Sequence, residues 1–467
     1  MVPLKCFRKF TLAFVFLLGG AAPLTSIAAD PAPTPEAASA PDAAAPTTSE
    51  ILTQKRVPVS GNPGAVNFST GDGFLQSLTP IKPDSGVTLG GIWLSDYNVL
   101  ISGGAEPGAS SWNSLLILSL MVDAEKLVNW QGAEFGIQFL QFNGENTNGQ
   151  AGSVQGYNGL PGAPPLDRSE LYQLWYLQKF GDLLAVRIGR TVPTYDFNNV
   201  TRPAPTQDPT LQIPAVSGLI FTPIFVNPTM LGALPGYYNS ANGLTVNFTP
   251  FKNIYFNYGF YDGNLANGVQ TGMVGPQFNG YYFNIWEAGM DWMIGDSHPG
   301  QFGAGVWYQT GVLDGPGDLQ EDGTGGFYLF GGQRVWGRKA DSGALTSKDG
   351  KSVISHSGQD ASVSVFYQFG VNNSETLPVN QYFGAGVTGF GLVPLRPSDS
   401  VGFGMAWSWL NPELFDRSSE LMFQSYYQAH IYAGAFIQPT VSYIPTPGAS
   451  SSLGGAWALT MRFTLLF

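Results

Sequence analysis

The side chains in this sequence that could carry chemistry are mainly carboxylates, and they are scattered along the chain. Five of them are expected on one face of alternating segments: Asp123, Glu134, Glu287, Asp291 and Glu420. Two carboxylates at the right separation can hydrolyse a glycosidic bond. Catalysis needs a nucleophile, a base and an orienting group that converge, and no motif of that kind is present. We therefore predict that the protein is not an enzyme.

The simpler interpretation is that these carboxylates ionise in a wet interior and pair with inward arginines: Arg187, Arg334 and Arg462. Neutral polar solutes tolerate such an interior when their hydroxyls donate to carboxylates and accept from arginines. The amides of Gln138 and Gln424 are expected on the same face. Trp175 and Trp307, if they also face inward, would offer flat apolar surfaces on which sugar rings can stack.

Metal, nucleotide and nucleic-acid sites lack support in the sequence. His298, His356 and His430 lie in different segments without ligand spacing, so we predict no metal and no cofactor. The string GAGVTG at 384–389 matches GxGxxG, but it lies in an alternating segment with no helix after it. The formal net charge is −12, and it becomes −15 without the three basic residues of the first 29. An acidic chain without a basic stripe argues against nucleic-acid binding.

The elements that must position these side chains are strands. Only 12% of the residues are charged, whereas about 25% is usual, which indicates a large surface that does not face water. After Gly20 there is no apolar run of the roughly 18 residues that a membrane helix needs; the longest is 115–122. Insertion into a membrane would therefore have to be by strands.

Sixteen segments alternate between apolar and polar residues with a period of two, and Gly, Pro, Asn and Asp clusters separate them. They lie near 88–100, 114–124, 131–143, 170–180, 182–190, 240–249, 252–261, 281–294, 301–310, 326–336, 361–370, 381–390, 400–410, 420–431, 432–444 and 455–467. We predict an all-β, transmembrane antiparallel β-barrel of about 16 strands, with short periplasmic turns and long extracellular loops. The last segment should pair with the first, so that Phe467 marks the seam and Arg462 faces the lumen.

The remaining parts of the chain have distinct compositions. We predict a signal peptide at 1–29, a Pro/Ala-rich disordered arm at 30–52, an N-terminal periplasmic segment at 53–86 and the barrel at 87–467. Long connections are expected at 144–169, 191–239, 262–280 and 311–325, and the Pro-rich 191–239 is the one expected to fold inward. The connection 337–360 is unusually long for a periplasmic turn. Trp292, Trp409 and Trp457 are expected in the interface girdle.

Several stretches resemble the carbohydrate-selective outer-membrane porins. They include MVDAEKLVNWQGAEFGIQFLQFNGENTNG, the VRIGR segment, GFGLVPLRPSDSVGFGMAW and SSELMFQSYYQAHIYAGAFIQPTVSYIPTPG with the terminal strand. The resemblance implies a sixteen-stranded barrel through which sugars diffuse, a constriction lined by charged and aromatic residues, and a homotrimer. The matching positions are Asp123, Glu125, Lys126, Arg190, Arg396, Asp399, Glu420 and Gln438.

The function that these observations predict is passive, carbohydrate-selective diffusion of mono- and small oligosaccharides across a bacterial outer membrane. The alternatives are a general diffusion porin without sugar preference, a barrel-embedded hydrolase and a secreted all-β binding protein. The expected partners are sugars bound weakly, outer-membrane lipid, and the barrel-assembly machinery through the strand that ends in Phe467.

Overall fold

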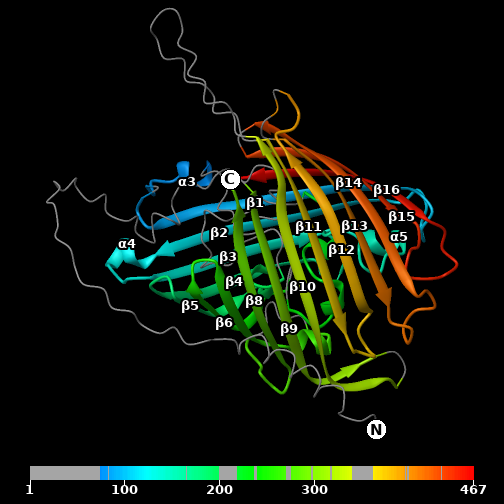
Figure 1. Cartoon of the computed structure of the whole chain (residues 1–467), viewed down its shortest axis with the longest axis horizontal. Coiled ribbons are helices and arrows are strands. Elements are labelled where there is room, and N and C mark those ends of the chain that lie inside the picture. The colour runs from blue at the N-terminus through cyan, green and yellow to red at the C-terminus, as the bar shows by residue number, and fades with distance from the viewer. Residues whose placement is uncertain are drawn as a thin grey trace, which may run out of the picture. The chain divides into compact units, whose positions relative to one another are not determined.

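The computed structural model describes residues 74–467 except 83, 165, 199–217, 236–238, 270–274, 296–297, 316–317, 339–360, 395, 397–398 and 433. In this part of the chain, strands β1 to β16 form a closed antiparallel barrel in which sequence neighbours pair and β1 pairs with β16 (Figure 1). The predicted fold is confirmed, including the number of strands. The predicted segments 1–29 and 30–52 lie outside the described residues, as does most of 53–86.

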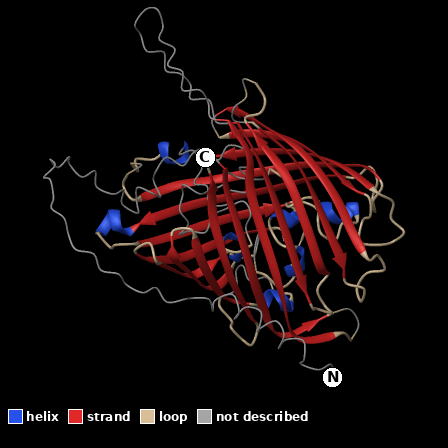
Figure 2. Cartoon of the chain, viewed as in Figure 1, coloured by secondary structure: helices blue, strands red, loops and turns tan. Residues whose placement is uncertain are grey.

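The strands are β1 Val87–Ser102, β2 Ser110–Asp123, β3 Ala133–Asn143, β4 Arg168–Phe180, β5 Leu184–Thr191, β6 Ala241–Phe251, β7 Ile254–Asp262, β8 Tyr282–Ile294, β9 His298–Asp314, β10 Gln320–Arg338, β11 Ala361–Asn372, β12 Val379–Phe390, β13 Ser400–Leu410, β14 Ser419–Tyr432, β15 Ala435–Ile444 and β16 Ala456–Leu466. The described helices are short (Figure 2): α3 Phe74–Ser77, α4 Ala124–Val128, α5 Thr147–Ala151, and the 3₁₀ helices η2 Pro193–Tyr195, η4 Thr222–Ile224, η5 Pro228–Met230 and η6 Asn264–Asn267. No helix among the described residues is long and apolar enough to cross a membrane.

Alternation along each strand separates an outer face from an inner one, because successive side chains of a strand point to opposite sides of the sheet. On β13, Val401, Phe403 and Trp407 are exposed, whereas Gly402 and the other inward positions are buried. On β14, Glu420, Gln424 and Gln428 share the inner face and are almost fully buried. The predicted facing of these strands is therefore correct.

Connections differ between the two ends of the barrel, as predicted. At the end where β1 begins and β16 ends they are short, for example 181–183 and 252–253. At the other end, 144–167 and 192–240 are long. The prediction of a long loop at 311–325 is wrong, because β9 and β10 continue to pair as far as Asp314 and Gln320. A bulge between Asp322 and Thr324 absorbs Gly323, whose φ is 71°, so a glycine-rich stretch still forms a hairpin.

The barrel closes between β1 and β16, as expected for the terminal strand. The backbone N–H of Gly91 donates to the carbonyl oxygen of Phe467 at 2.6 Å, and the N–H of Phe467 donates back at 3.1 Å. A Cβ on residue 91 would lie 2.7 Å from the ring of Phe467, so only glycine leaves room for that ring. Asp96 lies directly opposite Arg462 in the register, and both are buried on the inner face.

The three tryptophans that were expected in the interface girdle lie near the ends of their strands. Trp409 stacks on Trp407 with 4.2 Å between ring centroids, and Trp457 stacks on Tyr443 at 4.3 Å. The indole Nε1 of Trp292 donates to Gln333 at 2.8 Å. Amphipathic rings with a polar group are suited to the boundary between hydrocarbon and water, which agrees with the expected girdle.

The turn between β12 and β13 is held to β14 by a small polar clamp. Arg396 Nε donates to Asp399 at 2.7 Å, and one Nη of Arg396 donates to the carbonyl oxygen of His430 at 2.8 Å. The other oxygen of Asp399 accepts from the N–H of His430 at 3.0 Å, and the hydroxyl of Tyr427 also donates to Asp399. Arg396 and Asp399, two positions of the LRPSD stretch, therefore fasten a turn.

The clamp makes stability depend on pH. Burial alone would raise the pKa of Asp399, but the hydrogen bonds from Arg396, Tyr427 and His430 outweigh it and hold the pKa below its usual value. A depressed folded pKa means that the stabilisation is present above the unfolded value of about 3.9 and is lost as pH falls through the lower folded value.

We expect Asp399→Asn to lower the free energy of unfolding by about 1–3 kcal/mol at pH 7, because an asparagine cannot replace the charge-assisted bonds. Urea unfolding in detergent at pH 7 and pH 3 measures the effect. The gap between wild type and variant should shrink below about pH 4. A gap that is the same at both pH values would show that the charge of Asp399 has no role.

Candidate functional site in the barrel interior

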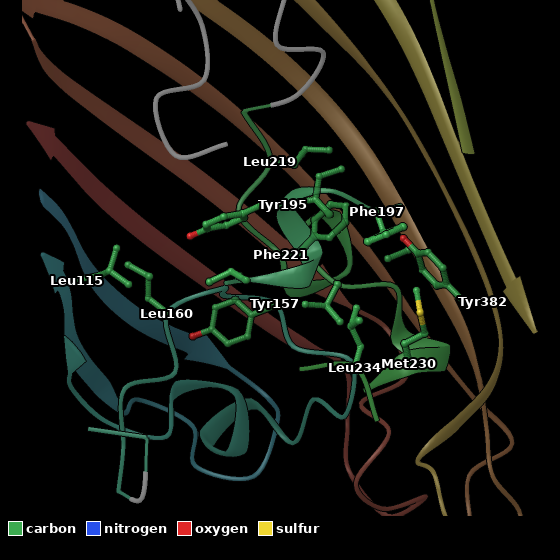
Figure 3. Close-up of a cluster of buried hydrophobic side chains, with 14 of the residues drawn as sticks. Leu115, Tyr157, Leu160, Tyr195, Phe197, Leu219, Phe221, Met230, Leu234 and Tyr382 are labelled. Atoms are coloured by element: carbon green, nitrogen blue, oxygen red, sulfur yellow. The ribbon is translucent and has the colours of Figure 1, made fainter. Parts of the chain in front are cut away.

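Two of the long loops enter the barrel. In the connection 192–240, Leu219, Phe221 and Met230 are completely buried, and in the connection 144–167 so is Leu160. Figure 3 shows these side chains packed together against wall residues such as Tyr382 of β12. The inward path expected for 191–239 is confirmed for its described residues. The inward path of 144–167 was not expected.

The two inward loops are hydrogen-bonded to each other. The N–H of Gly159 donates to the carbonyl oxygen of Ile220 at 2.7 Å, and the N–H of Thr222 donates to the carbonyl oxygen of Gly156 at 3.0 Å. The hydroxyl of Thr222 also donates to the carbonyl oxygen of Asn158 at 3.3 Å. Their backbones thus satisfy one another inside the barrel, so the loops form one unit and not two independent flaps.

One side of this unit is bound by inward residues of β14 and β15. Glu420 accepts from Ser153 Oγ at 2.6 Å and from the N–H of Val154 at 2.8 Å. Gln424 accepts from the N–H of Ile220 at 2.7 Å, and Gln438 donates to the carbonyl oxygen of Gly218 at 2.8 Å. All three were candidates for contact with solute, and the structure places them against loop backbone.

The start of the second loop is held by residues from another part of the wall. Arg187 of β5 forms an ion pair with Asp196, which also accepts from Thr245 Oγ1 at 3.2 Å. Glu287 of β8 accepts from the N–H of Asn198 at 2.6 Å and from the hydroxyl of Tyr328 at 2.8 Å. Arg187 and Glu287 therefore fix the entry of this loop into the barrel.

A cluster of opposite charges lies where β4 and β5 meet the inward loops. Arg168 Nε donates to Glu170 Oε1 at 3.0 Å, and Arg190 Nη2 lies 3.7 Å from Glu170 Oε2. Arg190 Nε donates to Ser240 at 2.8 Å. Glu170 Oε2 and Arg190 Nη2 are both buried without a hydrogen-bond partner among the described residues. Two charged atoms that face each other at this distance leave hydrogen-bonding capacity for a third group.

Sequence reasoning found Arg190 but missed Arg168 and Glu170. The segment was expected to begin at residue 170, whereas β4 begins at Arg168. The signal that would have found them is the alternation itself, because Arg168, Glu170 and Tyr172 fall on one face of β4.

Both candidate tryptophans face inward but are covered. Trp175 packs on β3, where a Cβ on Gly136 would lie 2.3 Å from its ring. The Cζ atom of Arg187 lies over the ring of Trp175, 5.7 Å from its centroid. Trp307 stacks on Phe283 at 5.9 Å. Their exposed fractions are 6% and 2%, so neither offers the open stacking surface that was expected. Glycines on the neighbouring strands allow these rings to lie flat against the wall.

The remaining candidates divide between the barrel end and its inner wall. Asp123 caps α4 by accepting from the N–H groups of Glu125 and Lys126 at 3.1 and 3.2 Å, and Lys126 lies 3.9 Å from Asp123. Glu134 pairs with Lys179 at 2.6 Å. On the inner wall, Gln138 donates to Ser119 at 2.9 Å, Asp291 lies opposite Gln301, and Arg334 lies opposite Ser364. The ion pairs of the cluster on β4 and β5 include none of these residues.

The seam carries a further buried ion pair, of which the sequence predicted only an inward Arg462. The guanidinium of Arg462 donates to both oxygens of Asp96 at 2.7 Å. Asn158 of the inward loop donates to Asp96 at 2.8 Å and to Asn98 at 2.9 Å, and Thr460 donates to Asn98 at 2.7 Å. Loop 144–167 is thus tied to the closing strands as well as to β14.

No group of three or more His, Cys, Asp or Glu side chains that could hold a metal ion occurs within the described ranges.

Comparisons with known proteins identify similar chains. Residues 115–467 match the family described as "Carbohydrate-selective porin, OprB family". The chain is 24% identical over 394 residues to Porin B of Pseudomonas aeruginosa, which covers 75% of this chain and 80% of that protein. The fold is similar to the high-pH structure of Pseudomonas putida OprB, with a TM-score of 0.67 and 18% identity over 82% of this chain and 95% of that one. The low-pH structure of the same protein gives a TM-score of 0.51 and 16% identity, covering 85% and 99%.

Proposed function

Because the chain belongs to the OprB family of carbohydrate-selective porins, we propose that its interior selects sugars at the charged cluster of β4 and β5. The protein is a porin of the bacterial outer membrane. Its family is one of channels, so the hydrolase alternative is set aside.

The site that we propose for sugar hydroxyls consists of Arg168, Glu170 and Arg190. The observation that carries the proposal is that Glu170 Oε2 and Arg190 Nη2 have no hydrogen-bond partner in the described part of the chain. The side chains of Arg168 and Arg190, 12% and 11% exposed, are the members of the cluster that a solute reaches first, and Glu170 lies behind them. A sugar presents hydroxyls on adjacent carbons, and each hydroxyl both donates and accepts. One hydroxyl can donate to the carboxylate while its neighbour accepts from the guanidinium. A monovalent ion satisfies only one of the two atoms.

Binding at this site must be weak, because a solute that is held tightly does not leave the channel. The inward loops reduce the width of the barrel interior that is available to a solute. We propose that mono- and small oligosaccharides pass by diffusion. The homotrimer stays a prediction from the resemblance, and recognition by assembly machinery stays a prediction from the strand that ends in Phe467.

A sugar titration of the ion current through single channels in a planar bilayer tests the site. Neutral monosaccharides added to one side should reduce the current with a saturable dependence on concentration, because an occupied site excludes ions. An uncharged polyol of similar size without a ring serves as the control for viscosity. A reduction that only follows solution viscosity for both solutes would contradict selection at this cluster.

A further inference from the structure

We propose that Glu420 and Gln424 of β14 are positioning residues that set the width of the passage by holding both inward loops against one wall. Neither side chain needs to touch the solute. The inference rests on the proposed function only in that the interior conducts solutes, and it concerns a different part of the barrel from the charged cluster. In the closed order of strands, β14 is separated from β4 and β5 by many strands in both directions.

Glu420 holds loop 144–167 with both of its carboxylate oxygens. Oε1 accepts from Ser153 Oγ at 2.6 Å and from the N–H of Gln155 at 3.3 Å. Oε2 accepts from the N–H of Val154 at 2.8 Å and, from the connection between β15 and β16, from the N–H of Gly448 at 2.6 Å. The side chain is fully buried, and these four donors are all neutral. A buried carboxylate that accepts several neutral donors is a strong local anchor.

Gln155 adds a second attachment next to Glu420. Its Nε2 donates to the carbonyl oxygens of Ala406 at 3.2 Å and of Glu420 at 3.3 Å. Its Oε1 accepts from Ser408 Oγ of β13 at 2.7 Å. The loop is therefore fixed to two adjacent strands over three consecutive residues, which leaves little freedom for it to move away from the wall.

Gln424 joins the two loops. Its Oε1 accepts from the N–H of Ile220, and its Nε2 donates to the carbonyl oxygen of Tyr157 at 3.0 Å and to Ser442 Oγ at 2.9 Å. Because Glu420 and Gln424 are four residues apart on one strand, they occupy the same face. One strand thus places the first loop and links it to the second.

Replacing Glu420 by glutamine removes acceptors for the loop without changing the size of the side chain. The amide keeps the shape of the side chain, but only its oxygen accepts, and its NH₂ group faces the other pair of donors. If the NH₂ group takes the place of Oε2, the buried N–H groups of Val154 and Gly448 lose their acceptor. If it takes the place of Oε1, the N–H of Gln155 loses its acceptor, while Ser153 Oγ can accept from the NH₂ group instead. Those groups regain hydrogen bonds by moving to water, which requires the loop to leave the wall.

We expect Glu420→Gln to raise the single-channel conductance by about twofold or more. The rate of liposome swelling with a trisaccharide, relative to a monosaccharide, should also rise about threefold or more, because a narrow passage excludes the larger solute. The heat-modifiable mobility in detergent gels should stay as in the wild type. Gln424→Met should also raise the conductance and the relative swelling rate with the trisaccharide. It leaves the four hydrogen bonds to Glu420 in place.

Glu321→Gln is the matched control. Glu321 accepts from Thr376 Oγ1 and from the N–H of Glu375, both at 2.8 Å, in the connection between β11 and β12. Glu321→Gln removes acceptors from the connection between β11 and β12 in the same way. It should leave the conductance and the relative swelling rate with the trisaccharide unchanged.

Wild-type conductance and size dependence in folded Glu420→Gln and Gln424→Met would overturn the proposal, as would equal changes in Glu321→Gln. If Glu420→Gln does not fold, Gln424→Met alone decides in the same way. A wider passage in a channel whose current shows no saturable reduction by sugars would support the positioning role and contradict the proposed function, so the two are distinguishable.

Discussion

Arg462→Met should lower the free energy of unfolding of the barrel by about 3–5 kcal/mol, the range for removing one partner of a buried ion pair. The guanidinium is 2% exposed and makes two hydrogen bonds to Asp96, whose side chain is fully buried. Without Arg462, a buried carboxylate is left at the junction of β1 and β16 with neutral donors such as Asn158. A buried charge without a partner lowers the free energy of unfolding far more than the loss of an exposed ion pair does.

Urea unfolding in detergent and the temperature of the heat-modifiable shift measure this loss. Lys126→Met is the control, because Lys126 and Asp123 are 3.9 Å apart at the barrel end and both are partly exposed. Its effect should be about 0–1 kcal/mol. The double variant Asp96→Asn, Arg462→Met should recover part of the loss, since it removes the buried charge. Equal effects of Arg462→Met and Lys126→Met would contradict a role for the seam pair.

Arg190→Met should weaken the reduction of ion current by monosaccharides about tenfold, as a rise in the half-saturating concentration. A hydrogen bond to a charged group contributes about 1.5 kcal/mol or more, and about 1.4 kcal/mol is a factor of ten. The variant also leaves Glu170 with Arg168 as its ion-pair partner, so the carboxylate still faces a cation. The loss should therefore reflect the missing donor to the sugar.

The same titration with Lys179→Met separates a local contact from a change in charge. Lys179 lies on the same strand as Glu170 and pairs with Glu134, so its removal also deletes one positive charge from β4. Its half-saturating concentration should stay within about twofold of the wild type. If Arg190→Met and Lys179→Met raise the half-saturating sugar concentration equally, the electrostatic field of the lumen explains the loss and the cluster does not.

The strands could be predicted from the sequence because their signal is local. Period-two alternation is present within each segment, and it gave the facing of Phe403 and Gln424 correctly. The hairpin at 311–325 was missed because its glycines are typical of loops, and only the pairing of Asp314 with Gln320 shows that they belong to strands. Composition does not reveal a bulge that restores the register.

The site was less predictable, because it depends on contacts between distant residues. Ser153 and Glu420 are 267 positions apart, and Asp96 and Arg462 are 366 apart. Alternation indicates that Glu420 faces inward, but not that a loop backbone will occupy its oxygens. Trp307 illustrates the same limit, since its orientation was predicted while the phenylalanine that covers it was not.

The most direct measurement of the central claim is swelling of liposomes that contain the purified protein, in sugars, amino acids and salts of graded size. Selection by a hydroxyl-binding cluster in a narrowed barrel predicts that monosaccharides enter faster than amino acids and salts of equal size. Entry should then slow steeply from di- to trisaccharides. Equal rates for all solutes of one size, or no swelling in any of them, would contradict this account of the channel.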